Sequence, residues 1–401
     1  MKKMLIVEDD QLVGNIYRHK FQVEGFEVEI ATDGEAGIKA VSTFRPDIVI
    51  LDLMLPRLNG VEVLRKIRAN PQFQSLPVLV LSNAYLSSLV QEAWKAGANN
   101  CLIKASCTPK QLIEVVHKTL GATVEPARTA AETPRRVAQA AQALELVSVP
   151  LPTQDDTAFQ TELRQAFLKS APEAVNQLRT LLQNFIKSEG DSVRLPNLFT
   201  LYRKVHSVTS NAAVAGLTAI ARFSSAIEAF IKELYEKPKN INASTIRTLA
   251  QTIDFLGLLS DHTMSADLEA LPPPSILVVD DEAISRRAVI YALEKAHLKC
   301  VSVEDPPTAL KMVAENRFDL IFLDVDMPNI SGFDLCTKLR TFPTNSKTPV
   351  VFVTGLTDFE SRARSTLSGG NDLIAKPFLF MELAVKALSF VLRGQLNLPR
   401  S

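Results

Sequence analysis

The stretch Leu-Ile-Val-Glu-Asp-Asp occupies residues 5–10, and Leu-Val-Val-Asp-Asp-Glu occupies residues 277–282. In each, a short apolar run leads directly into three acidic residues. Later polar residues repeat with one offset of 272 positions: Asp9, Asp52, Ser82 and Lys104 in the first copy, and Asp281, Asp324, Thr354 and Lys376 in the second. An accidental cluster would not recur in register, so the chain holds two copies of one domain.

Each copy alternates short β-branched runs with longer amphipathic stretches. In the first copy the β-branched runs lie at 5–7, 47–51, 78–81 and 102–103. In the second copy they lie at 276–279, 320–323, 350–353 and 373–375. Stretches such as 11–23 and 61–69 have helical periodicity. This alternation predicts a doubly wound parallel sheet in each copy, an α/β fold.

Between the copies the apolar period changes to 3.6. From Ala158 to about Leu268 this period predicts an all-α bundle of about four helices. The residues before it are rich in Ala, Pro and Thr and predict a linker with a helix-capable island at 131–147. A Pro-rich spacer precedes the second copy. The predicted domains are 1–121, 122–155 (linker), 156–268 (bundle), 269–274 (spacer) and 275–395.

The composition argues against several classes of function. The 44 basic and 44 acidic residues form no basic block, so nucleic acid and anionic membranes are not expected as main partners. The four cysteines lie in no metal-like spacing and are typical of structural thiols in a reducing compartment. The chain has no run of roughly 18 uninterrupted apolar residues, which a membrane span would need. We therefore expect a cytoplasmic protein whose main partner is another protein.

The repeated polar residues follow the predicted strands, and ligands bind at the carboxyl ends of strands in open parallel sheets. Clustered carboxylates repel one another unless a hard cation lies among them, and oxygen ligands suit Mg²⁺ or Mn²⁺. These carboxylates are Glu8, Asp9 and Asp52 in the first copy, and Asp280, Asp281 and Asp324 in the second. A hydroxyl (Ser82 or Thr354) and an ammonium (Lys104 or Lys376) suit a phosphoryl group bound beside the metal.

Both ends of the chain resemble receiver domains of two-component response regulators. The resemblance rests on the acidic runs, on Pro56 and Gly60 after Asp52, on Met327-Pro328 and Gly332 after Asp324, and on Lys376-Pro377. The separations of 43, 30 and 22 residues between the repeated members match that family. The resemblance implies flavodoxin-like sheets of five strands, with Asp52 and Asp324 as phosphoacceptors.

The resemblance also implies one Mg²⁺ per receiver, bound by the acids and by the backbone carbonyls of Met54 and Asp326. The hydroxyl and the lysine would stabilise the phosphoryl oxygens. Two features depart from the family pattern. Ala105 follows Lys104 where the family usually has proline after a cis peptide bond, and Cys101 and Leu373 stand where receivers often carry an aromatic residue. Because Met54 is apolar and Asp326 is acidic, we expect the two phosphoaspartates to differ in lifetime.

The middle region contains a segment that resembles the signature of histidine-phosphotransfer domains. His206, Ala212, Gly216 and Glu228 fall at matching spacings, which makes His206 a candidate phosphohistidine. Thr209 and Ser210 replace a usual lysine and glycine, so the positive charge near the imidazole is lost. A working relay would need a solvent-facing His206 that a receiver can reach. The alternative is a bundle that serves as a spacer, docking face or dimer contact.

We interpret the chain as a phosphorelay response regulator that accepts phosphoryl groups on Asp52 and Asp324, with His206 as a candidate relay. Its expected partners are a sensor histidine kinase or phosphotransfer protein and a downstream signalling protein, and a homodimer stays open. It would catalyse only its own phosphorylation and dephosphorylation. The main alternative is a scaffold that binds partners without phosphotransfer. A metal-dependent phosphatase is disfavoured because no substrate pocket is predicted beyond the receiver motif.

Overall fold

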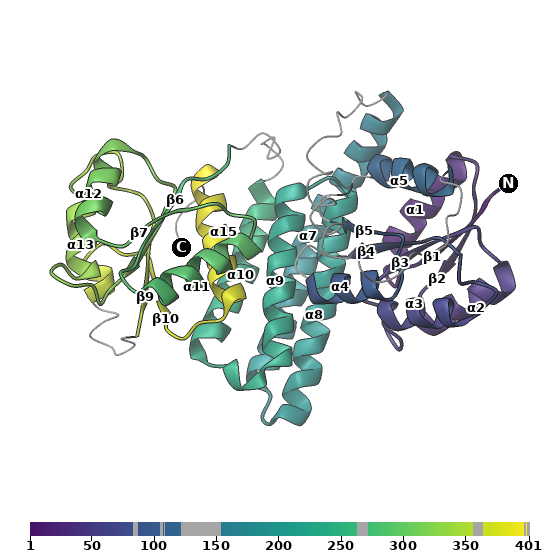
Figure 1. Ribbon diagram of the computed structural model, residues 1–401, viewed down its shortest axis with the longest axis horizontal. Helices are drawn as coiled ribbons and strands as arrows, with labels where there is room; N and C mark the ends of the chain where they lie inside the picture. The colour runs from purple at the N-terminus through teal and green to yellow at the C-terminus, as the bar shows by residue number, and fades with distance from the viewer. Residues whose placement is uncertain are drawn as a thin grey trace. The chain divides into compact units, whose positions relative to one another are not determined.

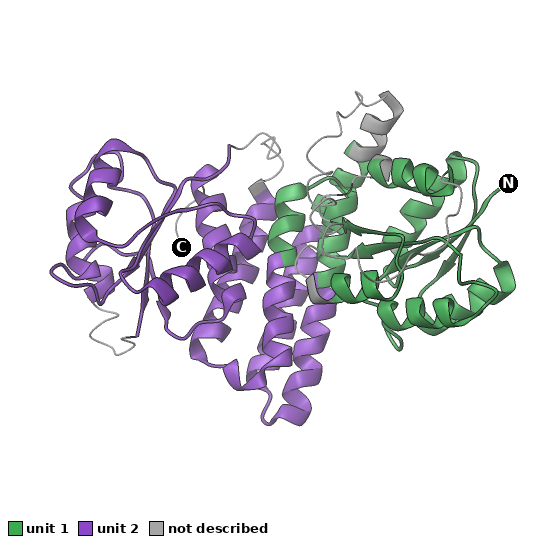
Figure 2. Cartoon of the chain, in the orientation of Figure 1, with its two compact units in different colours: residues 1–170, 206–225 green, residues 171–205, 226–401 purple. Residues whose placement is uncertain are grey.

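A computed structural model describes residues 1–82, 87–104, 107, 109–121, 154–262, 272–355, 364–396 and 398 (Figure 1). The chain divides into two compact units (Figure 2). The first comprises residues 1–170 and 206–225, and the second comprises residues 171–205 and 226–401. Helices of the middle region contribute residues to both units, and one unit boundary falls between Val205 and His206 within a helix.

The first unit contains a five-stranded parallel sheet. Its strands are β1 (Lys3–Val7), β2 (Glu27–Ala31), β3 (Ile48–Asp52), β4 (Val78–Ser82) and β5 (Asn100–Ile103). Their order is β2-β1-β3-β4-β5, and every neighbouring pair is parallel. The accompanying helices are α1 (Gln11–Val23), α2 (Gly34–Phe44), α3 (Gly60–Ala69), α4 (Ser87–Lys95) and α5 (Pro109–Gly121). β3 and β4 are buried throughout, as expected for central strands covered by helices on both faces.

The second unit repeats this sheet. Its strands are β6 (Ile276–Val279), β7 (Val301–Val303), β8 (Leu320–Asp324), β9 (Val350–Thr354) and β10 (Asp372–Ala375), in the order β10-β9-β8-β6-β7. The described helices beside it are α11 (Ala283–Lys295), α12 (Pro306–Glu315), α13 (Gly332–Leu339) and α15 (Phe380–Gln395). The strand order matches that of the first sheet, so the predicted duplication of one doubly wound fold is confirmed.

Gly60 and Gly332 occupy equivalent positions, each at the start of the helix that follows the third strand of its receiver along the chain. A Cβ on Gly60 would lie 2.1 Å from the backbone oxygen of Asp52, and one on Gly332 would lie 2.0 Å from that of Asp324. Such distances leave no room for a side chain. Each glycine therefore lets the next helix begin directly against the end of the strand that carries the aspartate.

The middle region is helical, as predicted. Its elements are α7 (Gln154–Lys187), α8 (Asp191–Val214), α9 (Thr218–Glu236), the short 3-10 helix η2 (Pro238–Asn240) and α10 (Ala243–His262). The apolar residues that recur at helical spacing are buried, for example Leu178 and Phe185 in α7 and Phe230 and Leu234 in α9. The predicted helix at 131–147 lies outside the described residues. Of the Pro-rich spacer, residues 272–274 are described and form neither helix nor strand.

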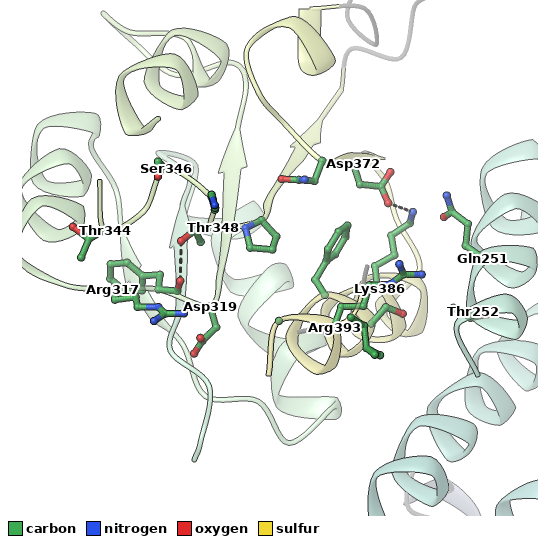
Figure 3. Close-up of a pocket in the computed structure, with 18 of the residues that line it drawn as sticks. Gln251, Thr252, Arg317, Asp319, Thr344, Ser346, Thr348, Asp372, Lys386 and Arg393 are labelled. Atoms are coloured by element: carbon green, nitrogen blue, oxygen red, sulfur yellow. Dashed lines mark hydrogen bonds and ion pairs between the residues drawn. The ribbon is translucent and has the colours of Figure 1, made fainter. Parts of the chain in front are cut away.

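Within the second unit, α15 packs against both its own sheet and α10. Glu382 of α15 is buried and accepts hydrogen bonds from the hydroxyls of Ser244 and Thr248, at 3.1 and 2.9 Å. A cavity of about 860 Å³ lies beside this contact (Figure 3). Its lining includes Asp319 and Pro349, which directly precede β8 and β9, so it lies at the amino ends of these strands. The repeated acids lie at the opposite, carboxyl ends.

Candidate functional site

The predicted site residues of the first copy meet at one edge of its sheet. Glu8 directly follows β1, Asp52 ends β3, Ser82 ends β4 and Lys104 directly follows β5. Because all these strands are parallel, their carboxyl ends lie at the same edge. The Lys104 ammonium lies 2.7 Å from a carboxylate oxygen of Glu8 and 2.7 Å from one of Asp52. The acids and the lysine therefore converge at this edge of the sheet, as predicted.

All three charged side chains are enclosed. Lys104 and Asp52 are each 1% exposed and Glu8 is 2% exposed. The backbone N–H of Met54 donates to the other oxygen of Asp52 at 3.1 Å. This amide and the lysine hold both oxygens of the carboxylate in place.

Burial and neighbouring charges act in opposite directions on these groups. Burial raises the pKa of Glu8 to about 7, although the Lys104 ammonium opposes it. Burial would also raise the pKa of Asp52, but the charge of Lys104 and the hydrogen bond with His206 hold that pKa well below its usual range. Burial lowers the pKa of Lys104, yet the two carboxylates keep it above its ordinary value. Asp52 therefore stays ionised, as an attacking carboxylate must be.

The second copy builds the same arrangement in a more open form. Lys376 lies 3.2 Å from Asp280 and 3.1 Å from Asp324, and it is 21% exposed. The backbone N–H of Val325 donates to the second oxygen of Asp324 at 2.8 Å. Burial raises the pKa of Asp324, and the Lys376 ammonium only partly opposes this. The peptide bond between Lys376 and Pro377 is cis, as the resemblance predicted, whereas Ala105 lies outside the described residues.

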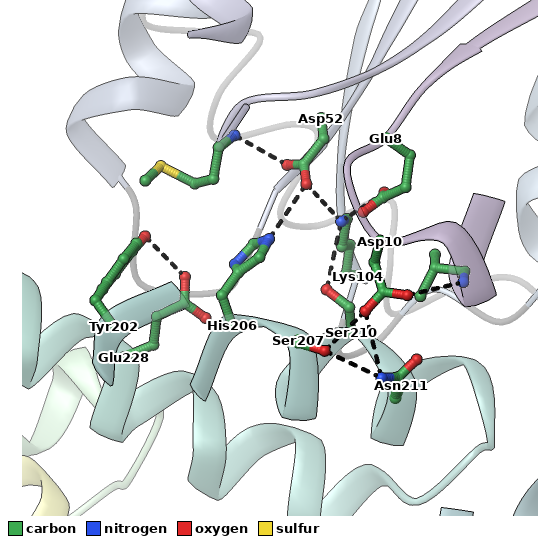
Figure 4. Close-up of polar contacts among 12 residues, drawn as sticks. Glu8, Asp10, Asp52, Lys104, Tyr202, His206, Ser207, Ser210, Asn211 and Glu228 are labelled. Atoms are coloured by element: carbon green, nitrogen blue, oxygen red, sulfur yellow. Dashed lines mark hydrogen bonds and ion pairs between the residues drawn. The ribbon is translucent and has the colours of Figure 1, made fainter. Parts of the chain in front are cut away.

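His206 points from α8 into the site of the first copy (Figure 4). Its Nε2 atom lies 3.3 Å from the same Asp52 oxygen that contacts Lys104, and its side chain is only 6% exposed. His206 lacks the solvent-facing position that a working relay was expected to need, because the sheet edge of the first copy covers the imidazole. The expectation that an aspartate can reach it agrees with this contact.

Sequence reasoning gave four neighbouring residues no part in this contact. Asp10 accepts hydrogen bonds from the Ser207 hydroxyl at 2.8 Å and from the Asn211 amide at 3.3 Å (Figure 4). The Lys104 ammonium donates to the Ser210 hydroxyl at 3.4 Å. The signal was present in the sequence, since 206 and 210, like 207 and 211, are four apart and share one helix face. Only the tertiary contact shows that this face meets the acids.

Comparison with known proteins identifies the repeated domain. The family described as the response regulator receiver domain matches residues 4–117 and 276–388, together more than half of the chain. The chain belongs to the response regulator receiver family. The predicted recognition of two receivers is therefore confirmed, and the histidine-phosphotransfer resemblance of the middle region stays a prediction.

Similar proteins match this chain over about a quarter of its length. Response regulator PleD of Caulobacter vibrioides is 39% identical over 102 residues, which are 25% of this chain and 22% of PleD. The phosphate regulon transcriptional regulatory protein PhoB of Rhizobium meliloti is 30% identical over 115 residues, 29% of this chain and 51% of PhoB. The chain thus spans about half or less of these relatives' own lengths.

Solved structures give the same partial likeness. The receiver domain of a Francisella response regulator is 27% identical, covering 30% of this chain and 97% of that one, with a TM-score of 0.28. The receiver domain of a sensor histidine kinase from Pseudomonas aeruginosa is 24% identical over 30% of this chain and 98% of that one, with a TM-score of 0.29. That structure holds a magnesium ion in its active-site cleft.

Both receivers carry acids that fit a hard cation. In the first receiver, ligand atoms of Glu8, Asp9, Asp52 and His206 lie within 4.8 Å of one another, and in the second those of Asp280, Asp281 and Asp324 do. The second oxygen of Glu8 is buried and accepts no hydrogen bond from the described residues. A buried carboxylate oxygen of this kind is stabilised when it coordinates a cation. The donor sets therefore fit Mg²⁺ in both receivers.

Among the described residues, the two receivers differ in how far their sites are covered. The lysine is 1% exposed in the first and 21% exposed in the second. The second acid, Asp9 or Asp281, is half-buried in the first receiver and exposed in the second.

No described helix is both long enough and apolar enough to span a membrane.

Proposed function

We propose that the chain is a phosphorelay response regulator whose Asp52 and Asp324 accept phosphoryl groups in a Mg²⁺-dependent reaction. The observation that carries this proposal is the lysine that joins two acids in both receivers. Lys104 lies between Glu8 and Asp52, and Lys376 lies between Asp280 and Asp324. A cation poised beside the acceptor carboxylate suits the developing charge of a transferred phosphoryl group.

In the proposed step an oxygen of the aspartate attacks phosphorus. The bond from phosphorus to the donor breaks, and an acyl phosphate forms on the aspartate. The lysine and the hydroxyl of Ser82 or Thr354 then bind the phosphoryl oxygens. When bound by the acids of the site, with the Met54 or Asp326 carbonyl, Mg²⁺ supplies further neutralisation of phosphoryl charge.

The partners belong to the same proposal. A sensor histidine kinase or a phosphotransfer protein would act as the donor, and His206 is the candidate phosphohistidine within the chain. A downstream signalling protein would respond to the phosphorylated form. The cytoplasmic location and the domain boundaries drawn from the sequence stay predictions.

The first test is intact-mass spectrometry of the full chain after incubation with acetyl phosphate and Mg²⁺. We expect up to two base-labile phosphoryl groups on aspartate in the wild type, one in Asp52→Ala or in Asp324→Ala, and none when both are changed. Chelation of Mg²⁺ with EDTA should prevent labelling. A wild-type chain that accepts no phosphoryl group with Mg²⁺ present would refute the proposed function.

A scaffold without phosphotransfer is the second candidate, and the closure of the first receiver favours it for that receiver alone. The Asp52 carboxylate is 1% exposed and already contacts His206, which limits access of an outside donor. In that case the first receiver would serve to bind α8. Labelling of Asp324 but never of Asp52, with or without the α8 contacts, would support this role for the first receiver.

A further inference from the structure

We infer that His206 exchanges phosphoryl groups with Asp52 of its own chain, and that the hydrogen bonds of Ser207 and Asn211 to Asp10 select the first receiver over the second. This inference rests on the proposed function. It goes further because it names one of two available aspartates as the exchange partner. It also assigns a specificity role to three residues outside the phosphoacceptor site.

The first argument is contact geometry. The Nε2 atom of His206 and the Asp52 oxygen are 3.3 Å apart, and both side chains are at most 6% exposed. A chance surface contact would leave such groups accessible to water. Instead α8 brings the only described pairing of an imidazole with a phosphoacceptor carboxylate into an enclosed space, where a transferred group is protected from hydrolysis.

The second argument is that polar contacts hold α8 in register beside this pair. Asp10 accepts from the Ser207 hydroxyl at 2.8 Å and from the Asn211 amide at 3.3 Å. Hydrogen bonds to a charged acceptor are stronger than neutral ones, and they fix direction as well as distance. Ser207 adjoins His206 in the chain, so the contact with Asp10 holds the turn of α8 that carries the imidazole.

The third argument is the difference between the receivers at the same positions. Asp10 of the first receiver corresponds to Glu282 of the second. The Glu282 side chain is one methylene longer, and it is exposed. One helical turn later, Gly14 of the first receiver corresponds to Arg286 of the second. The Arg286 guanidinium donates to the backbone oxygen of Asp280 at 2.6 Å. The second receiver thus places a longer acid and a bulky cation where the first has a short acid and no side chain.

The exchange itself is balanced without another reactant. The bond between phosphorus and Nε2 of phosphohistidine breaks as a bond forms between phosphorus and the Asp52 oxygen. The imidazole regains its electron pair, and the carboxylate becomes an acyl phosphate. The reverse step returns the group to His206. In both directions Nδ1 keeps a proton, so that the ring attacks and leaves as neutral imidazole, and Nε2 must first lose the proton that it donates to the Asp52 carboxylate. The two atoms, now 3.3 Å apart, must separate to admit phosphorus between them.

The experiment uses the full chain carrying Asp324→Ala, labelled with acetyl phosphate and Mg²⁺. Phosphohistidine is stable to base, whereas acyl phosphate is not, so base-stable label reports His206. We expect this label to appear at a rate that does not change on tenfold dilution, as for an intramolecular step. The His206→Gln variant should lack it. A chain with Asp52→Ala and intact Asp324 should give at least tenfold less.

The selecting contacts are tested by the double variant Ser207→Ala/Asn211→Ala in the Asp324→Ala chain. We expect label on Asp52 to persist while transfer to His206 falls at least tenfold. Ser207→Thr, which keeps the hydroxyl, should restore much of the rate when Asn211 is intact. Thr200→Ala is the matched control, because Thr200 is an exposed residue of α8 whose hydroxyl donates, in the part of the chain that the structure describes, to the backbone oxygen of Pro196 in the same helix.

The outcomes separate the two levels of the proposal. If Asp52 accepts no label in either the parent or the double variant, the proposed function of the first receiver fails, and the inference fails with it. If Asp52 is labelled but His206 is not, only the inference is overturned. Equal labelling of His206 from Asp324, or an unchanged rate in the double variant, would overturn the selection by Asp10.

Discussion

Position 54 and its counterpart 326 each lie two residues after a phosphoacceptor. Met54 is apolar and half-buried, whereas Asp326 is acidic and exposed. An apolar, partly covered neighbour excludes water from an acyl phosphate better than an exposed carboxylate does. The residue at this position should therefore influence how long each phosphoaspartate survives.

We expect the Asp52 phosphate to decay more slowly than the Asp324 phosphate. Met54→Asp should speed decay at Asp52, and Asp326→Met should slow it at Asp324, each roughly fivefold for about 1 kcal/mol in the barrier. The measurement is loss of label after donor removal, in Asp324→Ala and Asp52→Ala chains respectively. The two swaps control for each other, since they act in opposite directions. Equal decay in all four chains would contradict this expectation.

Lys104 is the other single residue with a large expected effect. Replacing it by Met would leave Glu8 and Asp52 buried without their cation, and breaking a buried ion pair costs about 3–5 kcal/mol. The same change at Lys376 should cost less, because that lysine is 21% exposed. Urea unfolding of the two variants, followed by a probe in each receiver, tests this order. A smaller loss at Lys104 than at Lys376 would contradict it.

At the scale of elements, α15 of the second receiver is joined to α10 by polar contacts within a mostly apolar interface. The carboxylate of Glu382 is 4% exposed and accepts from Ser244 and Thr248. Arg393 near the end of α15 lies 4.6 Å from the centre of the Phe255 ring. A buried carboxylate requires such partners, so these contacts fix the pairing of the two helices.

A double-mutant cycle on Glu382→Gln and Thr248→Val measures the central contact. We expect each single change to reduce the free energy of unfolding by about 1–3 kcal/mol. The coupling energy should be about 1 kcal/mol, as for residues in direct contact. Gln177→Ala is a suitable control, since Gln177 is an exposed residue of α7 whose amide bonds, among the described residues, to Glu173 on the same helix. Additive losses in the cycle would show that the contact is not energetically important.

At the scale of the whole molecule, the chain contains two receiver sites of the same kind that differ in how exposed they are to solvent. The site around Asp52 is covered by α8, while among the described residues the site around Asp324 exposes Lys376 and Asp281. A small phosphodonor should therefore reach the two aspartates at different rates.

We expect acetyl phosphate to label Asp324 in the Asp52→Ala chain at least several times faster than it labels Asp52 in the Asp324→Ala chain. Adding Ser207→Ala and Asn211→Ala to the latter should narrow the difference, because the contacts that hold α8 are then lost. Initial rates by intact-mass spectrometry provide the measurement. Similar rates in the two single-site chains would show that α8 does not restrict access.

Much of the site could be predicted because receiver chemistry lies at strand ends. Asp52 and Lys104 follow short apolar runs at fixed spacing, and parallel strands bring such positions to one edge. The docking of α8 could not be predicted in this way. Asp10 lies about 200 residues from Ser207 and Asn211, and each of these polar residues by itself fits a solvated helix or loop.

The sequence by itself determined the two α/β receivers, the helical middle region and the paired acids, hydroxyls and lysines, because local periodicity and a repeat in register carry that information. Only the tertiary structure decided that His206 is buried against Asp52, and that one receiver is covered while the other exposes its lysine. The physical reason is that burial and cross-chain hydrogen bonds depend on which surfaces meet. Two receivers with nearly the same motif can pack against different helices, and the motif alone does not determine which of the two sites becomes buried.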